Sequence, residues 1–322
     1  MSKSLYHQFY TAIEDGYSPG ESKRSYKMQH GELDNKIYMM SYKHELQVTA
    51  KQLAGYIRDN YPGVSRVRDI PGDAWQGYID KKAGEGISSL TVDKLRSHVS
   101  KLQACIDAKF GGNSRKHGTY NPIDTSDKQR CKPMPVTLSE ALKGVVSKPV
   151  ANCITLGQVL GLRQREAVQV RKEAFHLEPG AGRFGYGFVC LTGADGTKHG
   201  KPRTVDVRSE ADRRKLLDVL EGSSGVTAIS KKDGTAYDTG SIQRAMTRGL
   251  SKLGVSGYEQ NRLHAIRKTA AQEMYDFMRT STKDKMTAAE SKRAALEFTN
   301  KQIGHERADD KKLNNAYIAN QW

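Results

Sequence analysis

The chain has 322 residues, 37% of them hydrophobic, so it is long enough to form two domains with ordinary cores. Its formal net charge is +16 and its pI is near 9.6, and the basic residues are spread along the chain rather than gathered in one tail. A basic surface on a folded protein is typical of binding to DNA or RNA, although some ribosome-associated and membrane-surface proteins share this bias. No apolar run is long enough to span a bilayer, so we expect no membrane partner.

The chain begins without a charged leader followed by an apolar block, so we expect no secretory signal. Its four cysteines are far apart, and none of them forms a CxxC pair. We therefore expect reduced, packed thiols rather than disulfides or zinc ligands, and no metal site. Together these features favour a cytoplasmic protein, associated with the nucleoid if its partner is DNA.

Residues 1–38 are polar and rich in Gly, Ser and Tyr, and we interpret them as an N-terminal extension with at most a short helix near residues 4–14. Residues 39–112 are predicted to be a small helical domain. In its first helix, apolar residues recur at three- and four-residue steps from Leu46 to Ile57.

The same domain continues with a helix that begins at Pro71, since proline suits a first helical turn. A third helix is expected from about Ser89 to Phe110. Its outer faces carry basic side chains, which on most helices are simply solvated but here share one sign and suit contacts with phosphates. These residues are Lys94, Arg96, His98 and Lys101, and of them Lys94, Arg96 and Lys101 are candidate DNA contacts.

Residues 113–136 combine glycine, proline and basic residues without an apolar period, which predicts a basic linker. Residues 137–322 are predicted to form a larger domain. Residues 186–191 and 203–208 pattern like strands and are joined by a Gly-rich turn, which indicates an antiparallel hairpin. The fold is therefore expected to be mainly α-helical with a small antiparallel β-sheet. Helices are predicted at 138–147, 149–160, from Arg163 onwards, and at 209–221, 239–253, 262–279, 286–302 and 309–319.

The helix predicted over residues 262–279 carries a His-x-x-Arg pair. Apolar side chains from Leu263 to Phe277 form one stripe, and His264 and Arg267 lie three residues apart beside it. They offer an anion a titratable ring and a planar charged fork. Taken alone the pair is a weak signal, because most such pairs are polar surface residues.

Two further segments supply basic groups. In GLRQRE, Arg163 and Glu166 follow Gly161 at helical spacing. An arginine there can bind two phosphate oxygens at once, although an ordinary surface ion pair fits equally well. The hairpin loop carries Lys198 and Lys201, and a lysine on a flexible turn can give a proton to a leaving oxygen; otherwise the two are solvated turn residues.

The C-terminal segment contains Gly304-His305 and then Tyr317. A tyrosine in a short helix usually serves packing. Because a phenol has a pKa near about 10, a nucleophilic Tyr317 would need surrounding cations to stabilise its phenolate.

The order of these segments resembles the signature of the tyrosine recombinase, or phage integrase, family. GLRQRE is similar to its first-arginine box, TKHGKPRTV to its hairpin-lysine segment, LHAIRKTAA to its His-x-x-Arg box and IGHE…AYI to its Gly-His…Tyr end. The resemblance covers residues 137–322 as an α+β catalytic domain, and residues 39–112 resemble the family's helical, SAM-like core-binding domain. Each box alone is weak, whereas six roles in the family's order are specific. One departure is a longer segment between His305 and Tyr317 than most members have.

The resemblance implies that Tyr317 is the nucleophile and Lys198 the general acid. It implies that Arg163 and Arg267 clamp the scissile phosphate and that Glu166 supports the cluster.

The resemblance also implies that His264 and His305 contact the phosphate or assist proton transfer. Three further basic residues of this domain are candidate DNA contacts: Lys201, Arg203 and Arg262.

The implied reaction is site-specific cleavage and rejoining of double-stranded DNA through a 3′-phosphotyrosyl intermediate, in the service of a mobile element. It requires no metal and no cofactor. The implied assembly is a homotetramer on two DNA sites, which DNA-bending accessory proteins could assist.

Three other interpretations stay open at this point. A type IB topoisomerase-like nicking-closing enzyme would share the site type but would relax supercoils without strand exchange. A non-catalytic DNA-binding protein would keep the fold without forming covalent adducts. A structural RNA-binding protein is the least favoured, because it would not explain the ordered boxes.

Overall fold

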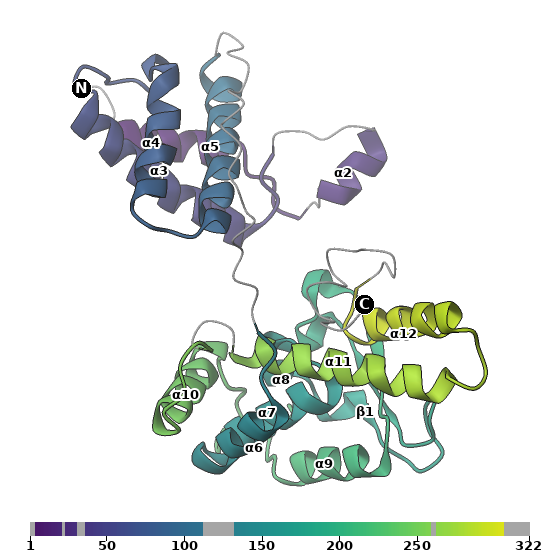
Figure 1. Ribbon diagram of the computed structural model, residues 1–322. Helices are drawn as coiled ribbons and strands as arrows, with labels where there is room; N and C mark the ends of the chain where they lie inside the picture. Colours follow the sequence, from purple (N-terminus) through teal and green to yellow (C-terminus); the bar gives the residue numbers. More distant parts are fainter. Residues whose placement is uncertain (1–3, 21–22, 31–35, 112–131, 259–261, 306–322) are drawn as a thin grey trace. The chain divides into compact units, whose positions relative to one another are not determined.

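The computed structural model describes residues 4–20, 23–30, 36–111, 132–258 and 262–305 (Figure 1). The chain divides into two compact units, Met1–Gln129 and Arg130–Trp322, each of which has its own hydrophobic core. In the described ranges, no helix is both long and apolar enough to cross a membrane.

The first unit is all-helical. Helices α1, α3 and α5 pack together, and α4 packs against α5 with Trp75, Tyr78 and Ile79 buried in the core of the unit. Helix α5 has the predicted bounds because the Ser88 side chain caps its start and Gly111 ends it at a φ of 65°. The helices are α1 (Leu5–Asp15), α2 (Lys23–His30), α3 (Met40–Asn60), α4 (Gly72–Gly84) and α5 (Ser89–Phe110), with a 3₁₀ turn at Val67–Asp69.

The predicted boundary at residue 39 is wrong, because helix α1, which precedes it, belongs to the core of the helical domain. Its residues Phe9 and Ile13 are fully buried in the core of the first unit. Ile37 is buried as well and pairs with Tyr17 in an isolated β-bridge that returns the chain to this core. The prediction failed because the three buried residues of α1, Phe9, Ala12 and Ile13, are dispersed among polar ones and form a buried face only when α3 and α5 cover them.

One side chain of α5 also differs from prediction. His98 was expected on an outer face but is only 5% exposed, and its Nδ1 lies 2.9 Å from the Thr49 hydroxyl of α3. A buried polar ring with a hydroxyl partner is an ordinary way to satisfy a histidine in a core.

The second unit is helical with one small sheet, as predicted. Strands β2 and β3 form the predicted antiparallel hairpin, with Val189 opposite Val205. A third strand, β1, was not predicted, since two residues are too few to show alternation; it pairs with the other side of β2. The elements are α6 (Val136–Val145), α7 (Lys148–Leu160), α8 (Gln164–Gln169), β1 (Phe175–His176), β2 (Phe188–Leu191), β3 (Arg203–Asp206), α9 (Glu210–Glu221), α10 (Thr239–Lys252), α11 (Arg262–Thr282) and α12 (Ala288–Gln302).

Helix α11 connects the parts of this unit, because it packs against α7 on one side and α12 on another (Figure 1). The contact with α7 is close at Gly157, where a Cβ atom would lie 2.9 Å from Leu263 Cδ1. This packing fixes the His-x-x-Arg segment of α11 against the ends of α7 and α12.

Candidate active site

The arginine box begins where α7 ends. Gly161 closes α7 at a φ of 59°, in the left-handed region that favours glycine. The turn places Arg163 just before α8, and the Arg163 backbone N–H donates to Glu166 Oε2 at 2.7 Å. Both predicted residues of this box are therefore oriented by the start of a short helix.

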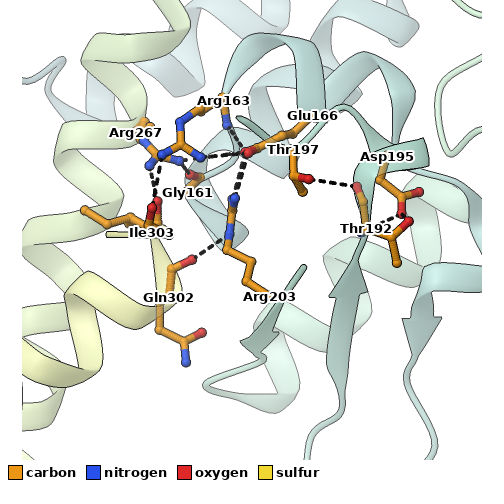
Figure 2. A network of polar contacts seen from close by, with 11 residues as sticks. Gly161, Arg163, Glu166, Thr192, Asp195, Thr197, Arg203, Arg267, Gln302 and Ile303 are labelled. Carbon is orange, nitrogen blue, oxygen red and sulfur yellow. Dashed lines mark hydrogen bonds and ion pairs between the residues drawn. The ribbon is translucent and has the colours of Figure 1, made fainter. Parts of the chain in front are cut away.

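Glu166 is the centre of the site (Figure 2). Its side chain is fully buried and accepts hydrogen bonds from Arg163 Nη1 at 2.8 Å and from Arg203 Nη1 and Nη2 at 2.6 and 2.7 Å. Burial by itself would raise the pKa of this carboxyl, but the hydrogen bonds and charge of Arg203, with those of its other partners, lower it to about 2. Glu166 is thus an anion that gathers guanidinium groups from different elements.

Arg267 is the innermost of these guanidinium groups. Its side chain is fully buried and lies 3.9 Å from Glu166 Oε2. It donates hydrogen bonds to the backbone carbonyls of Gly161 and Ile303, which joins the end of α7 to the end of α12. The guanidinium of Arg267 is therefore enclosed and not exposed to solvent in this structure.

Arg203 was predicted to contact DNA, but in this structure its side chain binds other groups of the protein. Its side chain is 8% exposed, its two Nη atoms both bind Glu166, and its Nε donates to the Gln302 carbonyl at 3.1 Å. Arg203 is an internal link between β3, α8 and α12.

The predicted Gly-His element meets the arginine box at Gly304. This residue has a φ of 70°, and a Cβ atom there would lie 3.0 Å from Arg203 Nη1 and 3.4 Å from Arg163 Nη1. Arg163 Nη2 also donates to the Gly304 carbonyl at 3.4 Å. Glycine is needed both for the backbone conformation and for this close approach.

The two predicted histidines are held in their neutral form. Partial desolvation, with the charges of Arg267 and neighbouring cations, lowers the pKa of His264 on α11 to about 4. Desolvation and the same arginine, followed by Arg163 and Lys198, lower the pKa of half-buried His305 to about 4. At neutral pH both rings can therefore accept a proton.

Lys198 lies on the loop between β2 and β3, at the start of a 3₁₀ turn, Lys198–Gly200, and its side chain is exposed. Its charge is among those that lower the pKa of His305, so the hairpin brings it to the same site. Lys201, on this loop, is also exposed. Tyr317 and the predicted helix at 309–319 are outside the described residues.

The other candidate DNA contacts have partners within the protein. On α5, Lys94 Nζ lies 2.7 Å from Glu45 Oε1, and Arg96 Nη1 lies 3.4 Å from Asp93 Oδ1. Lys101 donates to the Lys36 carbonyl at 3.3 Å. Arg262 begins α11 and is half-buried. These four residues stay predictions as DNA contacts.

Sequence reasoning missed Gln302, which ties α12 to β3. Its Oε1 accepts from the Asp206 backbone N–H at 2.7 Å, and its Nε2 donates to Asp206 Oδ2 at 2.9 Å. The residue is 1% exposed and belongs to none of the recognised boxes, so only tertiary structure reveals it.

Comparison with known proteins agrees with this geometry. Residues 136–284, which contain the arginine box, the hairpin and the His-x-x-Arg helix, match the family model described as Integrase. This segment, just under half of the chain, is therefore similar to an integrase. No curated protein sequence matches the chain.

Solved recombinases have a similar fold. A lambda integrase dimer bound to a COC′ core site has a TM-score of 0.64 at 13% identity, over 98% of this chain and 77% of that chain. XerH recombinase bound to palindromic difH substrate has a TM-score of 0.64 at 14% identity, over 98% and 90%. The integrase of transposon Tn1549, in complex with circular intermediate DNA, has a TM-score of 0.55 at 11% identity, over 96% and 94%.

Proposed function

We propose that this chain is a tyrosine recombinase that cleaves and rejoins double-stranded DNA at specific sites through a 3′-phosphotyrosyl intermediate, and that it serves a mobile element. The observation that carries the proposal is the convergence of Arg163, Arg203 and Arg267 on the single buried carboxylate of Glu166. One anion cannot neutralise three cations, so the cluster keeps excess positive charge. Fixed charge of this kind stabilises the developing charge on a phosphate in its transition state.

Exposure separates the roles of the arginines. The Arg163 side chain is 25% exposed, so it can bind a non-bridging phosphate oxygen directly. Arg267 is enclosed and would not bind the phosphate directly. It would act on the phosphate through its charge, and it holds the ends of α7 and α12 together. A preorganised group needs no reorganisation at the moment of reaction, which is why a rigid site favours the transition state.

The proposed step balances as follows. The Tyr317 oxygen attacks the phosphorus in line while its proton passes to neutral His305, and the tyrosyl–phosphorus bond replaces the bond from phosphorus to the 5′ oxygen. Lys198 gives a proton to that departing oxygen. Negative charge from the bound phosphate would raise the pKa of His305 from about 4, which improves it as a proton acceptor. Because one ester replaces another, a second DNA end can reverse the step.

The proposal also includes a homotetramer bound to two DNA sites. DNA-bending accessory proteins are its proposed partners, and the nucleoid is its proposed location. The supporting observation is that another structure with this fold is a lambda integrase tetramer bound to a Holliday junction, with a TM-score of 0.55 at 13% identity.

The test is a trapped cleavage reaction on nicked DNA from the sequences that flank the gene. Wild-type protein should form a covalent adduct, and Tyr317→Phe should bind the same DNA without forming one. The matched control is Tyr237→Phe, since Tyr237 packs against the core of the same unit. Adducts that persist in Tyr317→Phe would overturn the assignment of the nucleophile. Relaxation of supercoils without exchange between two sites would favour the topoisomerase-like function instead.

A further inference from the structure

We propose that Asp195 is a positioning residue for Lys198, and that it fixes the loop carrying this lysine before DNA binds. The inference rests on the proposed function, because a proton donor matters only if the bond from phosphorus to the 5′ oxygen is broken at this site. It changes the expectation from sequence, which placed Lys198 on a flexible turn.

Asp195 is a fully buried carboxylate with four hydrogen bonds. Oδ1 accepts from the Arg171 backbone N–H at 3.0 Å and from Arg171 Nε at 3.2 Å. Oδ2 accepts from the Thr192 N–H at 2.9 Å and from its hydroxyl at 2.8 Å (Figure 2). Burial by itself would raise the pKa of Asp195, but the hydrogen bonds from Arg171 and Thr192 lower it, so the group stays ionised. A buried charge held by four donors defines its position narrowly.

The residues between Asp195 and Lys198 are also packed. Gly196 has a φ of 76°, and a Cβ atom there would lie 2.4 Å from Gln169 Oε1 of α8. The buried Thr197 donates its hydroxyl hydrogen to the Thr192 carbonyl at 3.0 Å. The backbone just before Lys198 therefore packs closely, at Gly196, against α8, the helix that carries Glu166.

The loop is held at its other end as well. Arg203 follows Lys198 by five residues and binds Glu166 through both Nη atoms (Figure 2). Two buried carboxylates, Asp195 and Glu166, therefore fix the two ends of the segment that carries the exposed Lys198. A general acid must lie within about 3 Å of the leaving oxygen, so displacement of either end would remove Lys198 from reach.

The test compares two DNA substrates in single-turnover cleavage. One has the natural 5′ oxygen as leaving group, and the other has sulfur in that position. A thiol has a pKa of about 8.5 and leaves without a proton, so the sulfur substrate does not need Lys198. Asp195→Asn should lower cleavage of the oxygen substrate roughly 10- to 100-fold, which is at or below the lower end of the usual contribution of a general acid because the lysine is displaced and not removed. Its rate on the sulfur substrate should equal the wild-type rate, and Lys198→Ala should show the same pattern.

Two outcomes would overturn the inference: wild-type rates for Asp195→Asn on the oxygen substrate, or an equal loss on both substrates, which would indicate general damage to the site. Failure of the wild-type protein to form adducts on either substrate is a different result, because it would overturn the proposed function itself.

Two further variants keep the test sharp if Asp195→Asn folds poorly. Thr192→Val keeps the shape of an exposed residue and removes the hydroxyl that donates to Asp195 Oδ2 and accepts from Arg171 Nη2, so it should fold and show a smaller loss with the same rescue by sulfur. The matched control is Asp233→Asn, where Asp233 accepts from the Thr235 N–H and hydroxyl at 2.9 and 2.6 Å in an exposed turn. It should leave both rates unchanged, and thermal melting checks the folding of each variant.

Discussion

Arg203 of β3 and Glu166 of α8 form a bidentate pair, with distances of 2.6 and 2.7 Å between the guanidinium nitrogens and the carboxylate oxygens. The side chains are 8% and 0% exposed, so the pair is removed from solvent. Two parallel hydrogen bonds fix both distance and orientation. The pair therefore joins the lysine-bearing hairpin to the arginine box as one rigid part.

We expect Arg203→Ala to damage stability and cleavage rather than DNA affinity. Breaking a buried pair leaves an inadequately compensated charge and costs about 3 kcal/mol of the free energy of unfolding. The slope of DNA affinity against salt concentration should not change, because an enclosed side chain releases no counterions from DNA. Denaturant unfolding and binding at several salt concentrations measure the two effects.

Lys201→Ala is the control from the same hairpin, since Lys201 is exposed. It should leave stability unchanged and, if Lys201 contacts a phosphate, reduce the salt slope by about one. If Arg203→Ala instead left stability unchanged and reduced the salt slope, as expected for Lys201→Ala, Arg203 would be a DNA contact.

Much of the fold was predictable because its signals are local. The bounds of α5 follow from Ser88 and Gly111, and the end of α7 follows from Gly161. The order of the boxes likewise selected Arg163, which the structure places at the site. Each of these signals is carried by a few adjacent residues or by their order along the chain, so it can be recognised before the tertiary structure is known.

The rest depends on contacts between distant segments. Arg203 and Glu166 are 37 positions apart, and nothing in the spacing distinguishes a buried bidentate arginine from an exposed one. The burial of Arg267 and the four hydrogen bonds of Asp195 likewise cannot be recognised from sequence spacing. A charge inside a protein is predictable only once its partners are known.

Gly304→Ala tests the close approach between the Gly-His element and the arginines. The strain of a left-handed φ costs roughly 1–2 kcal/mol for a residue with a side chain. In addition, the new Cβ would displace Arg203 Nη1, which lies 3.0 Å from its position. We expect lower stability together with a large loss of cleavage in a trapped single-turnover assay.

The control is Gly254→Ala, because Gly254 has a similar φ of 68° and a Cβ there would meet no atom within 4 Å. It should lose stability to a similar extent and retain cleavage. Equal losses of cleavage in both variants would show that backbone strain, and not contact with the arginines, accounts for the effect.

The neutral histidines predict how stability depends on pH. Their pKa is about 4 in the folded protein, below the usual value of 6.5. As pH falls from 6.5 towards 4, the unfolded chain takes up protons that the folded chain does not, so the free energy of unfolding decreases in this window. His305→Asn should make the decrease shallower, as urea unfolding at a series of pH values would show. An unchanged slope would mean that His305 has an ordinary pKa.

Arg267→Lys separates charge from geometry at the innermost arginine. A lysine keeps the positive charge but cannot reproduce the planar fork that reaches the carbonyls of Gly161 and Ile303 together. Each buried carbonyl left without a donor costs about 1–3 kcal/mol, and the ends of α7 and α12 lose their link. We therefore expect Arg267→Lys to resemble Arg267→Ala, with lower stability and with cleavage lost far more than DNA affinity. Near-normal cleavage by Arg267→Lys would show that charge alone is sufficient there, and equal losses of cleavage and affinity would make Arg267 a simple DNA contact.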